Sequence, residues 1–163
     1  MLIWLKDASQ FQTDSDEAVT LFIDKIITCQ KPVDNADLLN LVDRQVHRHS
    51  YTCCKNTSSK CRFNYPQPPM KQTMILYPLD EDTPEKEIKI RRDNWKSIQG
   101  YLDESKEGED ISFDQLLMNL TITEENYLHA ISSSINTPTV FLKRNPYELR
   151  INNYSPACLC MES

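Results

Sequence analysis

Glycine is scarce in this sequence: the 163-residue chain has two glycines against nine prolines. A phosphate-cradling P-loop needs several glycines at fixed spacing, because backbone N–H groups must approach the phosphates closely. A P-loop is therefore excluded, and we expect no bound nucleotide. Turns must rely on Pro, Asn, Asp and Ser.

Long apolar runs are also missing. The longest, Met1 to Leu5, is far shorter than the roughly 20 residues that span a bilayer and shorter than the core of a signal peptide. We therefore expect no membrane partner and an intracellular location, nuclear or cytoplasmic. In these compartments, clustered cysteines bind metal more often than they form disulfides.

The sequence also lacks an excess of positive charge. The formal net charge of -6 argues against a protein whose whole surface follows nucleic acid, although it leaves room for a local basic patch. With 39% hydrophobic residues, the chain can form one domain with a real core or two small lobes.

Hydrophobic periodicity predicts an α+β chain that is mainly helical with a few short strands and a small Cys/His zinc knuckle. Asp14 with Glu17 resembles a capping pair for the first helix, and Thr123 is the expected cap of the last. On the long helix, Ile98 and Leu102 should face inward together with Ile88 and Trp95, and the charged face should be solvated. We expect helices over 16–29, 85–105, 112–120 and 123–135, and a second helix that is capped by Asp34 or Asn35 and runs to 47. Strands are expected over 1–5, 73–78 and 139–144.

Three regions follow from this pattern. Residues 1–79 form a segment with a strand, two helices and the knuckle, and 80–110 form a charged helix with linkers. Residues 111–163 hold a helical pair, a strand and an irregular C-terminal tail.

The stretch "HRHSYTCCKNTSSKCRF" (residues 47–63) carries the strongest chemical signal. Imidazole and thiolate together suit tetrahedral zinc, and four protein ligands make a structural rather than catalytic site. Residues two apart on a helix face different ways, so the two histidines can share a metal only if the second helix ends between them. From spacing alone, a disulfide or unbonded thiols stay open as alternatives. The expected ligands are His47, His49, Cys53 and Cys61, with Cys54 as a spare.

Catalytic interpretations are weaker. Cys53 or Cys54 beside His49 could be a thiol nucleophile with its base, but that chemistry needs an orienting group and an oxyanion site. His129 is a lone histidine and is interpreted as a surface or packing residue. We therefore predict no catalytic residues.

Four stretches in order, "MLIWLKDA", "FIDKIITCQKP", "QVHRHSYTCCKNTSSKCRFNYPQPP" and "LKRNPYELRINNYSP", resemble the Helitron transposon proteins. That family joins a rolling-circle replication initiator (Rep) to a DNA helicase. The resemblance covers most of the chain from Met1 to Pro156, least clearly over 80–109. It implies that His47, His49, Cys53 and Cys61 match a Cys/His metal-binding insert, with Cys54 extra.

The resemblance also implies what a central fragment of such a protein lacks. The family's metal-binding histidine motif directly precedes the strand similar to "MLIWL", and its nucleophilic tyrosines and helicase follow the stretch similar to "RINNYSP". This sequence ends in "ACLCMES", which departs from the family pattern. We therefore expect no nuclease or helicase activity from this chain by itself.

Two functions are favoured at this point, ahead of metal-dependent strand cleavage and of a decayed fragment without a selected function. The first is a transposable-element-derived, zinc-stabilised Rep segment that is an accessory DNA-binding or structural part. The alternative is a self-sufficient zinc-containing module that binds nucleic acid or a protein partner. Phosphate contacts would weaken steeply with salt, whereas a protein partner would be less sensitive. The expected DNA-facing cations are Arg48, Lys55, Lys60 and Arg62, with Tyr51, Phe63 and Tyr65 interleaved.

Overall fold

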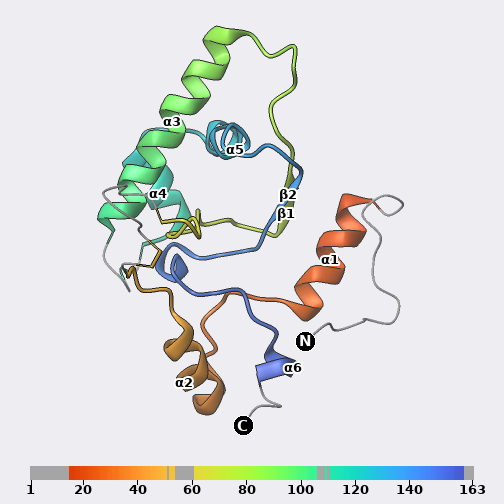
Figure 1. Cartoon of the computed structure of the whole chain (residues 1–163), viewed down its shortest axis with the longest axis vertical. Coiled ribbons are helices and arrows are strands. Elements are labelled where there is room, and N and C mark those ends of the chain that lie inside the picture. Colours follow the sequence, from red (N-terminus) through yellow and green to blue (C-terminus); the bar gives the residue numbers. More distant parts are fainter. Residues whose placement is uncertain (1–14, 51, 54–60, 106–108, 110, 160–163) are drawn as a thin grey trace.

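The computed structural model describes residues 15–50, 52–53, 61–105, 109 and 111–159. Over these residues the fold is α+β and mainly helical, as predicted (Figure 1). The strand expected over 1–5 lies outside the described residues. The elements in chain order are α1 (Asp16–Ile26), α2 (Ala36–Gln45), β1 (Met74–Leu76), α3 (Glu85–Glu104), α4 (Phe113–Leu120), α5 (Glu124–Ser132), β2 (Thr139–Phe141), the 3₁₀ turn η1 (Pro146–Glu148) and α6 (Pro156–Leu159).

Side-chain caps begin most of the helices. Ser15, rather than the expected Asp14, caps α1 by accepting a hydrogen bond from the Ala18 N–H at 3.2 Å. Thr123 caps α5 as predicted, and its hydroxyl accepts from the Asn126 N–H at 3.2 Å. These caps satisfy N–H groups that have no partner inside the helix.

Both N-terminal helices are shorter than predicted. α1 ends at Ile26 rather than Cys29, because Thr28 forms an isolated antiparallel bridge with Tyr154 and needs extended backbone. The two N–H···O hydrogen bonds of this bridge are each 2.8 Å long. α2 begins after its cap Asn35 and ends at Gln45, which leaves the following histidines outside the helix.

The sheet has two strands, β1 and β2, which lie side by side in Figure 1. They pair antiparallel, with Ile75 opposite Val140 at the centre. Both strands are shorter than predicted. Beyond the sheet, the same two chain segments form an isolated antiparallel bridge between Met70 and Arg144. Between the sheet and this bridge, the Thr73 hydroxyl accepts a hydrogen bond from the Lys143 N–H at 2.9 Å.

Two hydrophobic clusters stabilise the chain. The larger one joins α3, α4 and α5, and the smaller one joins α2 to the C-terminal segment with α6. Ile98 and Leu102 are buried as predicted, whereas Ile88 and Trp95 are half-buried. The buried residues of the larger cluster are Met70, Leu76, Ile98, Leu102, Leu116, Tyr127, Ala130, Ile131 and Leu149. Those of the smaller cluster are Leu38, Val42, Ile151, Tyr154 and Leu159.

Buried polar groups hold the segment after β2. The Arg144 guanidinium donates to the backbone carbonyls of Glu148 (2.6 Å) and Ile151 (2.8 Å). The Glu148 carboxylate accepts from the Lys31 N–H at 2.6 Å. Because both side chains are buried, these bonds replace water and fix the path of the segment, which was expected to be an irregular tail.

Contacts between elements cross the expected boundaries at residues 79 and 110. β1 pairs with β2, and α3 packs on α5. The division into three regions stays a prediction. Within the described residues, no helix combines the length and apolar character needed to cross a bilayer.

Candidate metal centre

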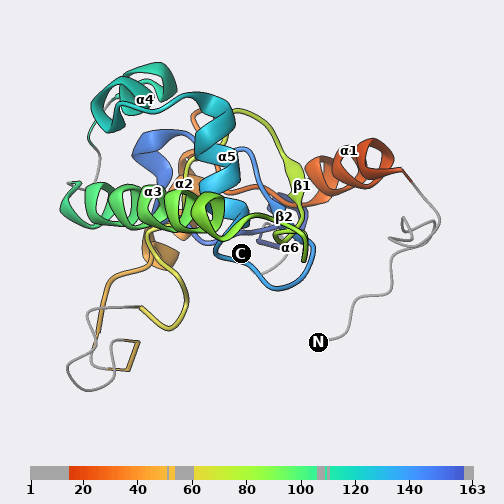
Figure 2. The same cartoon turned by 90° about the horizontal axis from the view of Figure 1, so that it is seen from above.

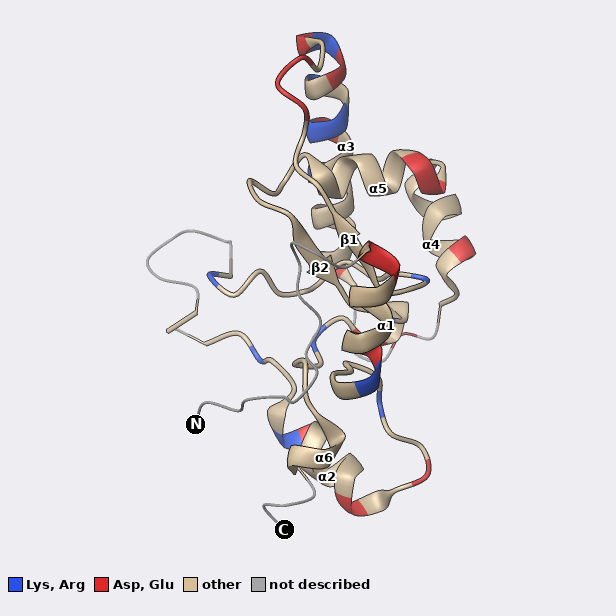
Figure 3. Ribbon diagram, turned by 90° about the vertical axis from the view of Figure 1, so that its right-hand side faces the viewer, with Lys and Arg blue, Asp and Glu red and all other residues tan. Residues whose placement is uncertain are grey.

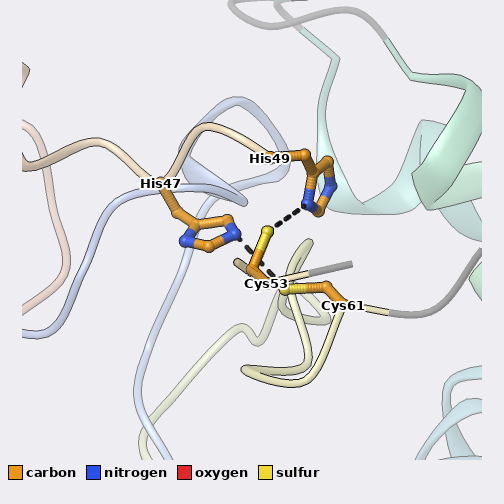
Figure 4. Close-up of side chains that lie close together, drawn as sticks. All are labelled: His47, His49, Cys53 and Cys61. Carbon is orange, nitrogen blue, oxygen red and sulfur yellow. Dashed lines mark hydrogen bonds between the residues drawn. The ribbon is translucent and has the colours of Figure 1, made fainter. Parts of the chain in front are cut away.

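The structure brings all four expected ligands together. Their potential ligand atoms all lie within 4.8 Å of one another (Figure 4). His47, His49 and Cys53 come from the stretch after α2, and Cys61 begins the next described segment. Figure 2 shows these two segments leaving the helical body on the same side. No second group of three or more such residues forms in the described part of the chain.

The distances suit tetrahedral coordination. The Cys61 sulfur lies 3.3 Å from His47 Nε2, and the Cys53 sulfur lies 3.7 Å from His49 Nδ1. Zn–S distances of about 2.3 Å and Zn–N distances of about 2.0–2.1 Å place a ligand sulfur and a ligand nitrogen roughly 3.5 Å apart in a tetrahedron. The four donors can therefore hold one metal ion after small adjustments.

The two histidines can approach the same metal ion because α2 ends before them. Because the helix stops at Gln45, neither histidine has helical backbone. The His47 N–H donates to the Arg150 carbonyl at 2.7 Å, which anchors this ligand to the C-terminal segment. The two imidazole rings meet edge to face, with centroids 5.1 Å apart.

Tight turns position the two cysteines. The Ser50 N–H donates to the Cys53 sulfur at 3.1 Å, and this sulfur also lies 3.3 Å from the Ser50 carbonyl oxygen. The Arg62 N–H donates to the Cys53 carbonyl at 2.9 Å and so joins the two ligand segments. After Cys61 the chain turns through Asn64, which has a φ of 56°, a left-handed conformation that asparagine tolerates better than most residues.

Tyr65 supports the His47 imidazole from one side. The two rings stack with centroids 4.4 Å apart and an angle of 15° between their planes. Burial raises the pKa of Tyr65, so the phenol stays neutral at physiological pH. Tyr65 was expected to face DNA, but the structure places it, half-buried, against the metal centre.

Burial divides the group into two halves. Cys53 and Cys61 are 2% and 7% exposed, whereas His47 is half-buried and His49 is exposed. Cys61 carries a free thiol, so no disulfide joins it to Cys53. Four protein donors complete a tetrahedron and leave no position for substrate, which is the arrangement of structural rather than catalytic sites.

The expected DNA-facing residues are described only in part. Arg48 and Arg62 are both exposed and flank the ligands, and the Arg62 guanidinium lies 4.5 Å from the centroid of the exposed Phe63 ring. Lys55 and Lys60 lie outside the described residues, as do Tyr51 and Cys54.

Sequence reasoning missed two supports of the site. Arg150 contributes a backbone carbonyl from a distant segment, and Ser50 contributes a backbone N–H. Any residue type can supply these groups, so no sequence pattern marks them. His129 is not part of the group. It lies half-buried on α5, which agrees with its interpretation as a packing or surface residue.

Comparison with known proteins identifies no relative of this chain. No protein family, no curated protein and no solved structure matches this chain, and the resemblance to Helitron proteins stays an expectation from the sequence alone.

Proposed function

We propose that His47, His49, Cys53 and Cys61 bind one zinc ion, and that this ion stabilises a non-catalytic binding module. The convergence of two sulfurs and two imidazole nitrogens within 4.8 Å is the observation that carries the proposal. Mixed imidazole and thiolate ligands favour zinc over magnesium and calcium, which prefer oxygen donors.

The role of zinc is to join chain segments. Cys61 leads into the segment that contributes Met70 to the larger cluster, and His47 follows α2 of the smaller cluster. A shared ion would hold these segments together. The binding free energy of such an ion is then part of the folding free energy.

DNA is the ligand that we propose for the surface around the ion. The support is the pair of exposed cations, Arg48 and Arg62, beside the ligands, together with the exposed ring of Phe63. Arginine pairs with phosphate, and an exposed aromatic ring can stack on an unpaired base. In this proposal the chain is a Helitron-like Rep segment that helps to position DNA without cleaving it.

Native mass spectrometry of the reduced chain, before and after chelation, tests the zinc proposal. We expect one zinc per chain, lost in Cys61→Ser together with a clear fall in melting temperature, because the binding free energy of a structural zinc is part of the folding free energy. Cys158→Ser, which removes a half-buried thiol outside the group, should keep both the metal and the melting temperature. Full metal content and unchanged melting in Cys61→Ser would contradict the proposal.

Fluorescence anisotropy with labelled oligonucleotides, at salt concentrations between 50 and 200 mM, tests DNA binding. The Arg48→Ala/Arg62→Ala variant should reduce the slope of log affinity against log salt by about 2, since two phosphate contacts are lost. The matched variant Lys25→Ala/Arg44→Ala removes two exposed cations from α1 and α2 and should retain the slope. Equal effects of the two double variants would refute DNA binding at the metal centre.

A further inference from the structure

A cleft of about 600 Å³ lies next to the metal centre. Its walls are the segment 61–68, the C-terminal half of α3 and the segment 134–141. This volume falls within the range of roughly 300–1,000 Å³ that is typical of ligand pockets. The metal centre shares only Cys61 and Tyr65 with the cleft, so the rest of the lining has no role in the zinc proposal.

Aromatic side chains supply the apolar part of the lining. Trp95 comes from α3, Phe141 from β2 and Tyr65 from the segment after the metal ligands. Trp95 and Phe141 pack against the larger cluster with one part and line the cleft with another. Rings held in this way give a rigid surface against which a ligand can pack at little cost in conformational entropy.

Amide side chains supply the polar part. Gln99 on α3 and Asn136 in the segment 134–141 both line the cleft, and their side chains have no hydrogen-bond partner among the described residues. Each amide offers two N–H donors and one carbonyl acceptor. This is the complement that a peptide backbone needs, because it carries one donor and one acceptor per residue.

Charge narrows the class of ligand. Among the described residues that line the cleft, Asp103 alone has a charged side chain, and it is exposed. Figure 3 shows that the lysines and arginines of α3 lie among acidic residues near its N-terminal end. A phosphate group in the cleft would face a carboxylate and no cation. A lysine or arginine side chain would be attracted by Asp103 and by the net charge of -6 of the chain.

We propose that this cleft binds an extended segment of a partner protein. A proline or aromatic side chain of that segment packs on Trp95 and Phe141. Its backbone bonds to Gln99 and Asn136, and a lysine or arginine lies toward Asp103. Grooves that combine aromatic walls with hydrogen-bonding side chains recognise extended, often proline-rich, segments in this way.

The cleft shares a wall with the metal centre. Tyr65 stacks on His47 and also lines the cleft, as does Cys61. The other end of this wall is held by the Gln67 N–H, which donates to the Leu149 carbonyl at 2.9 Å. If zinc binds as proposed, it fixes this wall, and peptide affinity should fall when zinc is removed.

Selection of 12-residue peptides from a random phage-displayed library, with the full zinc-loaded chain as target, tests the proposal. Binding is then measured by tryptophan emission in a Trp4→Phe background, in which Trp95 is the remaining one of the two tryptophans. We expect enriched peptides with a proline or aromatic residue near a lysine or arginine, and a change in Trp95 emission on binding.

Surface variants locate the binding site without disturbing the core. Asp103→Lys should weaken the selected peptides about tenfold or more, since attraction becomes repulsion, and Asn136→Ala should weaken them several-fold. Asp82→Lys, a matched charge reversal on an exposed residue before α3, should leave the affinity unchanged. Failure to enrich any peptide, equal losses in both lysine variants, or a Trp95 response to single-stranded oligonucleotides instead of peptides would overturn the proposal.

Zinc content measured on the same samples separates the two proposals. Peptide binding by a chain that takes up no zinc would support the cleft and contradict the zinc site. A zinc-loaded chain that binds no peptide would contradict the cleft alone.

Discussion

Cys29 lies fully buried in the extended segment after α1, where its thiol donates to the Lys143 carbonyl at 3.2 Å. Burial raises the pKa of this thiol to about 11, and the nearby Arg144 guanidinium offsets only part of that effect. The thiol is therefore neutral at physiological pH and acts as a small packing group. Its hydrogen-bond partner is 114 residues away in sequence, so the sequence alone offered no partner for this cysteine.

Alkylation tests the state of Cys29. A rise of the pKa from 9.0 to about 11 lowers the thiolate fraction at pH 8 about a hundredfold, so iodoacetamide should modify Cys29 far more slowly than the half-buried Cys158. Peptide mapping by mass spectrometry measures both rates. Equal rates in the folded protein, with both becoming fast in urea, would show that Cys29 is accessible.

The same shift predicts how stability depends on pH. The folded-state pKa of Cys29 is raised, so between pH 9 and 11 the thiol loses its proton in the unfolded chain but keeps it in the folded protein. The contribution of Cys29 to the free energy of unfolding is therefore complete below pH 9 and is lost as the pH rises toward 11. Comparing urea unfolding of the wild type with that of Cys29→Ala isolates this residue from other titrating groups. As the pH rises over this range, the free energy of unfolding of the wild type should fall relative to that of Cys29→Ala.

At the scale of elements, helix starts were easier to predict than helix ends. Ser, Asn and Thr caps act on backbone a few residues away, and therefore leave a local signal. α1 ends at Ile26 because the next residues pair with Tyr154, and that partner cannot be read from the local sequence. The strands expected over 73–78 and 139–144 were located but overestimated in length, because hydrophobic pattern does not show where pairing stops.

The end of α4 contains a strained residue. Thr121 has a φ of 56°, a left-handed conformation that is unfavourable for a β-branched side chain, and it is exposed. Thr121→Gly should remove this strain and raise the free energy of unfolding by about 1 kcal/mol, measured by thermal or urea denaturation. Thr83→Gly, at a residue that lacks a positive φ, should lower stability instead. Destabilisation by both substitutions would contradict the argument.

At the scale of the whole molecule, the candidate metal centre follows α2 of the smaller cluster in the chain and precedes Met70 of the larger cluster. The grouping of the four candidate ligands could be predicted because all four residues fall within one short stretch with suitable chemistry. The neighbouring cleft could not, because its walls come from 61–68, α3 and 134–141, which are brought together only by the fold. Figure 1 shows α2 and α6 at one end of the molecule and α3 at the other.

Hydrogen exchange should show how far zinc couples these clusters. After chelation we expect faster exchange in α2 and the segment 151–159, because the smaller cluster then loses its connection through His47. Amides of α3 and α5, which pack within the larger cluster, should keep their protection. Chelator added to Cys61→Ser should cause no further change, and uniform acceleration in every element would show a single cooperative unit instead.

The pairing of β1 with β2 also bears on the order of folding. The strands are separated by residues 77–138, so the sheet must close a long loop of chain, whereas the metal ligands lie within residues 47–61. Closing the longer loop costs more chain entropy, and contacts between distant residues slow folding. We infer that the metal loop and the individual helices form early. The sheet forms late, when packing of α3 on α5 has already brought its two strands within reach.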